Sequence, residues 1–250
     1  MTSLADRLSD FNLDASSLVV VLTGAGISAE SGVPTFRGKD GLWKTYRAQD
    51  LATPQAFQRD PKTVWEWYDY RRQIVATKRP NPAHVALAEL DQKIPHFQLI
   101  TQNVDGLHLG AGARRVIELH GNLFRVRCTV EGTVFENREV PLKEIPPHCR
   151  CGALLRPDVV WFGEPIPHDL LEKSFEACRQ ASLMLVIGTS AVVQPAASMP
   201  LLARQAGAPV VEINPEETPI SPFADISLRG RAGEIVPEFV TSLLDVLGIG

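Results

Sequence analysis

The chain has 250 residues, a length that suits one large domain or one domain with a smaller insertion. Hydrophobic residues make up 44% and charged residues 22%, which argues against wholesale disorder. The net charge of -4 offers no basic surface for nucleic acid or an anionic membrane, and no apolar stretch approaches the roughly 20 residues that span a bilayer. Residues 1–17 are too polar for a signal peptide, so we expect a cytoplasmic protein.

Short apolar segments bounded by turn residues predict β-strands at residues 18–24, 97–103, 115–119, 183–190 and 209–214. Helical patterns alternate with them at residues 81–93, 168–181, 196–206 and 232–247. The first of these helices begins with Asn81 as N-cap and Pro82 at the first helical position. Strands that are apolar on both faces and alternate with helices indicate a parallel sheet covered on two sides. We therefore predict an α/β fold with a doubly wound, Rossmann-like sheet.

Two stretches interrupt this alternation. Residues 40–80 are helical and rich in aromatic side chains, and residues 124–156 contain cysteines, charges and prolines. We interpret both as insertions that form a smaller lobe, the second of them resembling a zinc ribbon. The predicted Rossmann-like domain then comprises residues 1–39, 81–123 and 157–250.

The first predicted strand leads into Gly24, Ala25, Gly26 and Ser28. Glycine permits a tight turn and close approach of the backbone to a pyrophosphate, whose charge a following helix N-terminus favours. The spacing departs from G-x-G-x-x-G because Ala29 occupies the third position. The loop by itself leaves two interpretations open: a dinucleotide site, or a tight turn between strand and helix.

Polar residues and a glycine lie at the ends of three further predicted strands or just after them. They are Gln102, Asn103 and Asp105, then Gly188, Thr189 and Ser190, and finally Asn214 and Glu216. Because ligands of doubly wound sheets bind at the carboxyl ends of the strands, this pattern predicts a long polar ligand across the strand tips.

His120 follows the predicted strand 115–119 and precedes Gly121. A single histidine is more often a hydrogen-bonded loop or core residue than a catalyst. Its position at a strand end favours a general base, because imidazole accepts a proton near neutral pH.

Five motifs, in this order, resemble those of sirtuins, the NAD-dependent protein deacylases: "GAGISAESGVPTFRG", "TQNVDGLH", "ELHG", "RPDVVWFGE" and "VIGTS". The resemblance runs from about residue 18 to 245, nearly the whole chain. It implies an enzyme that consumes NAD, releases nicotinamide and transfers an acyl group from lysine to ADP-ribose. It also implies acyl-lysine proteins or peptides as substrates, and we expect a monomer without nucleic-acid or membrane partners.

The resemblance implies a role for individual residues. His120 matches the general base, while Phe36 lies over the ribose and nicotinamide and Arg37 beside the reacting centre. Val160 and Phe162 match the segment that pairs with the substrate peptide. The other residues that match NAD contacts are Gly24, Ala25, Gly26, Ser28, Gln102, Asn103, Asp105, Gly188, Thr189, Ser190, Asn214, Glu216 and Ala232.

A helix is predicted from Asp60 as N-cap and Pro61 onward, and its apolar stripe carries Tyr68 and Arg71. A guanidinium on an apolar face needs an anion or access to water. It can pair with a protein carboxylate, or it can bind a substrate carboxylate together with Tyr68. The Tyr-x-x-Arg pattern resembles the bacterial and mitochondrial sirtuins that remove succinyl and malonyl groups, so we expect a desuccinylase or demalonylase that also removes acetyl groups.

Cys128, Cys149 and Cys151 lie close together in the sequence, which in a reducing compartment favours a metal site or a catalytic role over disulfides. Sirtuins typically carry a structural zinc on two cysteine pairs. Here Glu131 stands where one partner cysteine is expected, and His148 stands at another. Zinc with either residue as fourth ligand, or a site that has decayed into packing, remain the alternatives. Cys178 stands alone and is expected to be a core thiol.

Two other functions use the same residues differently. A mono-ADP-ribosyltransferase would use the same pocket with another acceptor, and a nucleotide-sensing module would bind without catalysis. The complete "TQNVDGLH" and "ELHG" motifs favour the enzyme over the binding module.

Overall fold

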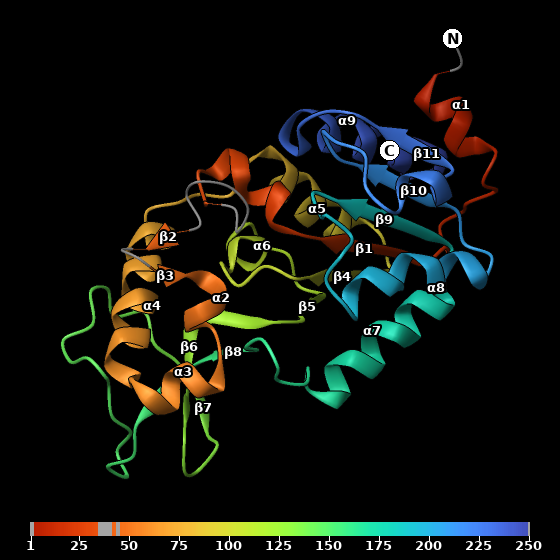
Figure 1. Cartoon of the computed structure of the whole chain (residues 1–250). Helices are drawn as coiled ribbons and strands as arrows, with labels where there is room; N and C mark the ends of the chain where they lie inside the picture. Colours follow the sequence, from red (N-terminus) through yellow and green to blue (C-terminus); the bar gives the residue numbers. More distant parts are fainter. Residues whose placement is uncertain (1–2, 35–41, 44–45, 250) are drawn as a thin grey trace.

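The computed structural model describes residues 3–34, 42–43 and 46–249 (Figure 1). Within these residues the large sheet is parallel and has six strands in the order β11-β10-β9-β1-β4-β5. They are β1 (Val19–Thr23), β4 (Phe97–Thr101), β5 (Val116–Glu118), β9 (Leu183–Ile187), β10 (Val210–Ile213) and β11 (Ile226–Leu228). The predicted α/β fold is confirmed. Strand β11 was not predicted, because three residues with Ser227 in the middle carry no strand pattern.

Strand β1 lies at the centre of the sheet, and all its residues are buried. Val19 pairs with Phe97 of β4 on one side and with Leu183 of β9 on the other. The chain continues from β1 toward β4 and β5, and later returns to β9, β10 and β11 on the opposite side. The strand order therefore reverses between β1 and β9, and a doubly wound sheet opens its ligand crevice at such a point.

Helices cover both faces of this sheet (Figure 1). One layer contains α1 (Leu4–Ser9), α5 (Pro82–Lys93) and α9 (Ala232–Val246), and the other contains α7 (His168–Gln180) and α8 (Met199–Gln205). Alternate residues of β1 enter the two cores, with Val21 in the first and Leu22 in the second. Cys178 is buried in the second core as predicted, and burial raises the pKa of its thiol to about 12.

A second, antiparallel sheet lies apart from the first, in the order β7-β6-β8 (Figure 1). Its strands are β6 (Gly121–Cys128), β7 (Val134–Glu136) and β8 (Leu155–Val159). The neighbouring elements are β2 (Leu42–Trp43), β3 (Tyr46–Arg47), α2 (Ala48–Leu51), α3 (Pro54–Arg59) and α4 (Pro61–Ala76). Trp65 and Tyr68 of α4 share one hydrophobic core with Val126 and Leu155 of this sheet. The two insertions thus pack together, while the exact domain boundaries stay a prediction.

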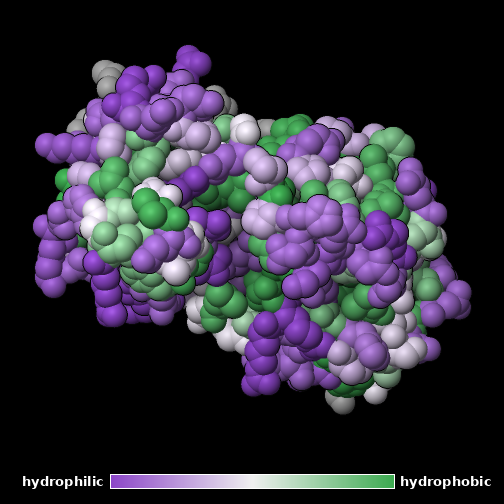
Figure 2. All heavy atoms as spheres, turned by 90° about the horizontal axis from the view of Figure 1, so that it is seen from below, coloured by the Kyte–Doolittle hydropathy of each residue, from purple (hydrophilic) through white to green (hydrophobic). Residues whose placement is uncertain are grey.

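Short segments complete the fold: η1 (Ala25–Ser31), α6 (Leu107–Gly110), η3 (Ala196–Ser198) and η4 (Ser221–Phe223). On the face seen in Figure 2, hydrophobic residues lie interspersed among hydrophilic ones. No helix in the described part of the chain combines the length and hydrophobicity needed to cross a lipid bilayer.

From the burial of two histidines we predict how the stability of the fold depends on pH. The His84 and His108 rings lie 4.8 Å apart, and burial lowers the pKa of His84 to about 4. In the unfolded chain the His84 imidazole takes up a proton near pH 6.5. The stability that comes from burying the neutral ring is therefore fully present above that pH, and it decreases as the pH falls toward 4. His84 alone should reduce the free energy of unfolding by about 2 kcal/mol between pH 7 and pH 5.

Urea unfolding at pH 7 and pH 5 measures this loss. His84→Asn should make the dependence shallower, whereas the exposed control His96→Asn should keep the wild-type slope. An equal slope in all three proteins would contradict the assignment to His84.

Candidate active site

The glycine loop after β1 packs directly against the loop after β9. A Cβ on Gly24 would lie 2.8 Å from the Thr189 Cα, and one on Gly26 would lie 2.7 Å from the Gly188 carbonyl oxygen. The chain then forms the 3₁₀ helix η1. Glycine is therefore required here by contact between two strand ends, a reason that the sequence pattern did not reveal.

Side chains at the end of β4 bind the glycine loop. Asn103 Nδ2 donates to the Gly24 carbonyl oxygen over 3.0 Å and to Ser28 Oγ over 3.2 Å. Ser28 Oγ donates to Asp105 Oδ2 over 2.8 Å, and burial raises the pKa of the Asp105 carboxyl. Residues predicted separately at two strand ends thus form one buried hydrogen-bonded group.

Hydrogen bonds also connect the end of β4 with the ends of β9 and β10. Gln102 Nε2 donates to Thr189 Oγ1 over 3.0 Å, and Asn214 Nδ2 donates to the Thr189 carbonyl oxygen over 3.2 Å. The remaining predicted NAD residues flank these contacts: Ala25 at the start of η1, Ser190 after β9, the exposed Glu216 after β10 and the buried Ala232 at the start of α9. Phe36 and Arg37 lie outside the described residues.

His120 lies between β5 and β6, and its ring orientation is fixed by the backbone. Its Nδ1 lies 3.0 Å from the Gln102 carbonyl oxygen, which can only accept, so Nδ1 carries the hydrogen and Nε2 keeps its lone pair. Burial lowers the pKa of His120, although the bond to Gln102 acts in the opposite direction. At neutral pH the ring is therefore an uncharged base. The Val160 amide donates to the His120 carbonyl oxygen over 2.9 Å and brings the predicted peptide-pairing segment beside it.

Tyr68 and Arg71 both lie on α4, Tyr68 buried in the smaller core and Arg71 half-buried. Arg71 Cζ lies 4.9 Å from the Trp67 ring centroid and 5.8 Å from that of Tyr68. Burial lowers the pKa of the half-buried Arg71, while the nearby Tyr68 and Asp105 raise it. The Arg71 guanidinium on α4 therefore interacts electrostatically with Asp105, which follows β4 and binds Ser28. The sequence did not show that these two residues lie near each other.

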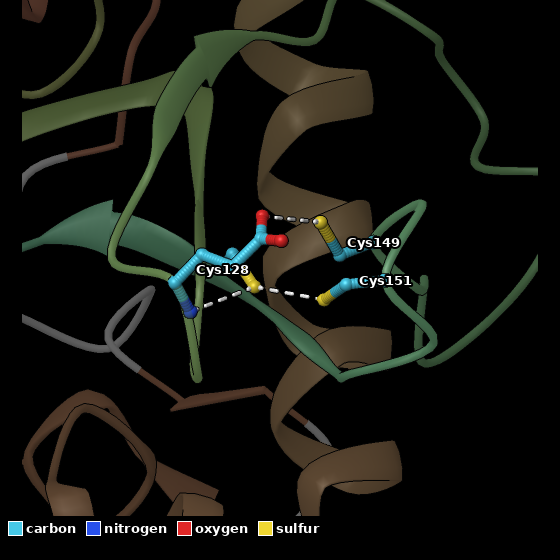
Figure 3. A group of neighbouring side chains, drawn as sticks. Cys128, Cys149 and Cys151 are labelled. Atoms are coloured by element: carbon cyan, nitrogen blue, oxygen red, sulfur yellow. Dashed lines mark hydrogen bonds between the residues drawn. The ribbon is translucent and has the colours of Figure 1, made fainter.

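Three cysteines point toward one another next to β6 (Figure 3). Cys128 Sγ lies 3.5 Å from Cys151 Sγ, and Cys149 Sγ lies 3.7 Å from Glu131 Oε2. Ligand atoms of all four residues lie within 4.8 Å of one another. The Glu131 amide donates to Cys128 Sγ over 3.4 Å, a hydrogen bond that lowers the pKa of this thiol.

This cluster fits a tetrahedral zinc ion. Zinc–sulfur bonds of about 2.3 Å place two sulfurs roughly 3.8 Å apart, close to the separations seen here. His148 instead places its Nδ1 2.8 Å from Glu144 Oε1. Of the two candidates for the fourth ligand, the structure thus brings Glu131 into the cluster. Cys128, Cys149, Cys151 and Glu131 can hold a zinc ion that ties the loops between β6 and β8 together.

Glu131 should contribute to metal affinity. We expect about one equivalent of zinc in unchelated protein, and an affinity at least about 10-fold lower in Glu131→Ala, because only three ligands remain. Metal content and chelator competition measure both quantities. The control His148→Ala should bind zinc like wild type. Less than about a tenth of an equivalent in wild type would contradict a zinc site.

The fold and the site together define a class of protein. A doubly wound sheet whose strand ends form one polar group at the switch point is typical of dinucleotide-using α/β proteins, and the neutral histidine beside it adds a base. The sequence profile of the Sir2 family matches residues 24–195. The chain belongs to the Sir2 family.

Curated relatives agree over most of the chain. "NAD-dependent protein deacylase 1" of Caldanaerobacter subterraneus subsp. tengcongensis is 56% identical over 91% of this chain and 94% of its own length. The "NAD-dependent protein deacylase" of Aquifex aeolicus is 55% identical over 86% of this chain and 90% of its own length. The chain is therefore an enzyme, an NAD-dependent protein deacylase.

Solved structures show the same fold. A Sir2 homologue in complex with NAD has a TM-score of 0.89 and 52% identity, covering 96% of this chain and 93% of its own. A complex of Sir2 with a p53 peptide and NAD⁺ has a TM-score of 0.83 and 35% identity, covering 100% of both chains.

Proposed function

We propose that this deacylase prefers acidic acyl groups, succinyl and malonyl, on protein lysines and also removes acetyl groups. The observation that carries the proposal is the pair of buried Tyr68 and half-buried Arg71, whose guanidinium lies 5.8 Å from the Tyr68 ring centroid and interacts electrostatically with Asp105 beside the glycine loop. A guanidinium and a hydroxyl in this place offer an acyl carboxylate two donors. The expected monomeric state and cytoplasmic location remain part of the proposal.

We assign NAD to the joined strand ends. The loop of Gly24, Ala25, Gly26 and Ser28 takes the phosphates, and Phe36 and Arg37 act near the ribose and nicotinamide. Gln102, Asn103 and Asp105 serve the nicotinamide and ribose. Gly188, Thr189, Ser190, Asn214, Glu216 and Ala232 serve the phosphates and adenosine. The hydrogen bonds of Ser28 with Asp105 and Asn103, and the hydrogen bond from Gln102 to Thr189, support this assignment because they hold the loops in one arrangement.

In the mechanism the chain positions two substrates and moves a proton. NAD, when bound, supplies a glycosidic bond whose carbon accepts the acyl-lysine carbonyl oxygen as nicotinamide departs. Because an amide oxygen is a weak nucleophile, close positioning must supply much of the rate. His120 then takes a proton from a ribose hydroxyl at Nε2, and the hydroxyl oxygen attacks the acyl carbon. The lysine amine leaves and one water molecule is consumed, so that the acyl group ends on ADP-ribose.

The substrate peptide is expected to pair with the segment after β8. Val160 is half-buried and Phe162 is 51% exposed, so this segment has a surface open to a partner. The solved complex of Sir2 with a p53 peptide shows that a relative binds such a ligand. For this chain, a peptide carrying one acylated lysine is the corresponding substrate.

One assay tests the proposal. Peptides of one sequence, bearing acetyl-, malonyl- or succinyl-lysine, are incubated with NAD, and nicotinamide, O-acyl-ADP-ribose and free lysine are measured. We expect all three products, with the highest kcat/KM for an acidic acyl group. ADP-ribosylated protein without free lysine would indicate a transferase instead, and a higher kcat/KM for acetyl-lysine would contradict the acidic preference.

A further inference from the structure

Trp161 lies between Val160 and Phe162 but faces the opposite way. It is 3% exposed, whereas Phe162 is 51% exposed. Its indole Nε1 donates a hydrogen bond to the Tyr68 hydroxyl oxygen over 2.9 Å. The contact connects the segment after β8 with α4.

The direction of this hydrogen bond is fixed by chemistry. An indole N–H can only donate, so the Tyr68 oxygen must accept, and the hydroxyl hydrogen must point away from Trp161. In the part of the chain that the structure describes, Trp161 is the one hydrogen-bond partner found for this hydroxyl. Its hydrogen is thus available to an acceptor that arrives beside it.

We propose that Trp161 is a positioning residue for acyl recognition, which holds the Tyr68 hydroxyl as a donor toward the carboxylate of an acidic acyl group. The inference rests on the proposed function. Tyr68 is buried, and burial raises its pKa to about 12, so the hydroxyl keeps its hydrogen at neutral pH. The hydroxyl then donates one hydrogen bond beside Arg71, whose guanidinium supplies the charge.

Trp161 is itself held on its ring face and at its backbone. Arg156 Cζ lies 3.6 Å from the Trp161 ring centroid, and Glu164 binds Arg156 through two hydrogen bonds of 2.6 and 2.8 Å. Glu164 Oε2 also accepts from the Trp161 amide over 3.0 Å. The Phe57 ring lies 5.2 Å away. These contacts fix the indole plane, and with it the direction of the N–H.

The fixed Tyr68 hydroxyl also explains why acidic acyl groups and acetyl groups should bind with different affinities. A succinyl group gives the Tyr68 hydroxyl an acceptor, whereas an acetyl group leaves the buried donor without a partner from the substrate. A buried donor left unpaired costs free energy, so the fixed hydroxyl favours the acidic acyl group in binding. The role of Trp161 should appear in KM for acidic substrates rather than in kcat.

Trp161→Phe tests the proposal, since phenylalanine keeps an aromatic ring and removes the N–H. With succinyl-lysine peptide we expect KM to rise about 3- to 10-fold, the size of one neutral hydrogen bond, with kcat within about twofold. With acetyl-lysine peptide of the same sequence, KM should stay within about twofold. Trp161→His retains a ring N–H and should recover part of the succinyl KM.

A double-mutant cycle shows whether Trp161 acts through Tyr68. In the Tyr68→Phe background there is no hydroxyl to orient, so adding Trp161→Phe should change the succinyl KM no further. Full additivity of the two changes, or equal effects of Trp161→Phe on both acyl classes, would overturn the proposal. Failure of Trp161→His to recover any succinyl affinity would do the same.

The cycle separates this inference from the proposed function. If Arg71→Met and Tyr68→Phe selectively impair succinyl peptides but Trp161→Phe does not, only the positioning role fails. If wild type removes no acidic acyl group, the acyl preference fails and the role of Trp161 fails with it.

Discussion

Replacing Arg71 by methionine should lower kcat/KM for succinyl-lysine peptides by about 10- to 100-fold and leave deacetylation within about threefold of wild type. A charge-assisted hydrogen bond contributes about 1.5–3 kcal/mol, which corresponds to this range. Methionine preserves most of the apolar length of the side chain against the Trp67 ring, so packing of α4 should be retained. Steady-state kinetics on matched succinyl and acetyl peptides measure both effects.

The control for this variant is Arg79→Met, an exposed arginine just beyond α4. It should leave both activities unchanged. The alternative role of Arg71 is electrostatic support of Asp105, which lies in its surroundings. Equal losses of desuccinylation and deacetylation would favour that role, because the NAD site proposed at Asp105 and Ser28 would serve every acyl substrate.

Replacing His120 by alanine should lower deacylation by about 10²- to 10⁴-fold, the usual contribution of a general base. In the proposed mechanism the base acts only after both substrates are bound and nicotinamide has left, so binding of NAD and of peptide should change little. Rapid-quench measurement of a single turnover separates the chemical step from binding. His96→Ala, an exposed histidine, is the control and should remain active.

The pH profile gives a second measure of the same residue. His120 must be uncharged to act, so the rate rises with pH through its pKa, and burial lowers that pKa. The acidic limb of kcat/KM should therefore lie below the ordinary imidazole value of about 6.5. A limb above that value, or a fully active His120→Ala, would assign the base to another group.

The sequence by itself determined the class of fold and predicted which edge of the sheet binds the nucleotide. β1 and β9 are recognisable because short strands buried on both faces are continuously apolar. The residues after them are recognisable because ligands bind at the carboxyl ends of parallel strands. Both signals come from residues that are neighbours in the sequence, so they can be recognised without the tertiary structure.

The tertiary structure decided what depends on contacts between distant residues. Gly26 meets Gly188, and Trp161 meets Tyr68 across 93 positions of the sequence. Glu131 joins the cysteines while His148 pairs with Glu144, a choice that spacing left open. No periodicity encodes such pairings, because hydrogen-bond and ligand geometry arise only when separate elements pack together. The spacing of residues in the sequence identified the candidates, and the packing of separate elements determined which residues each of them contacts.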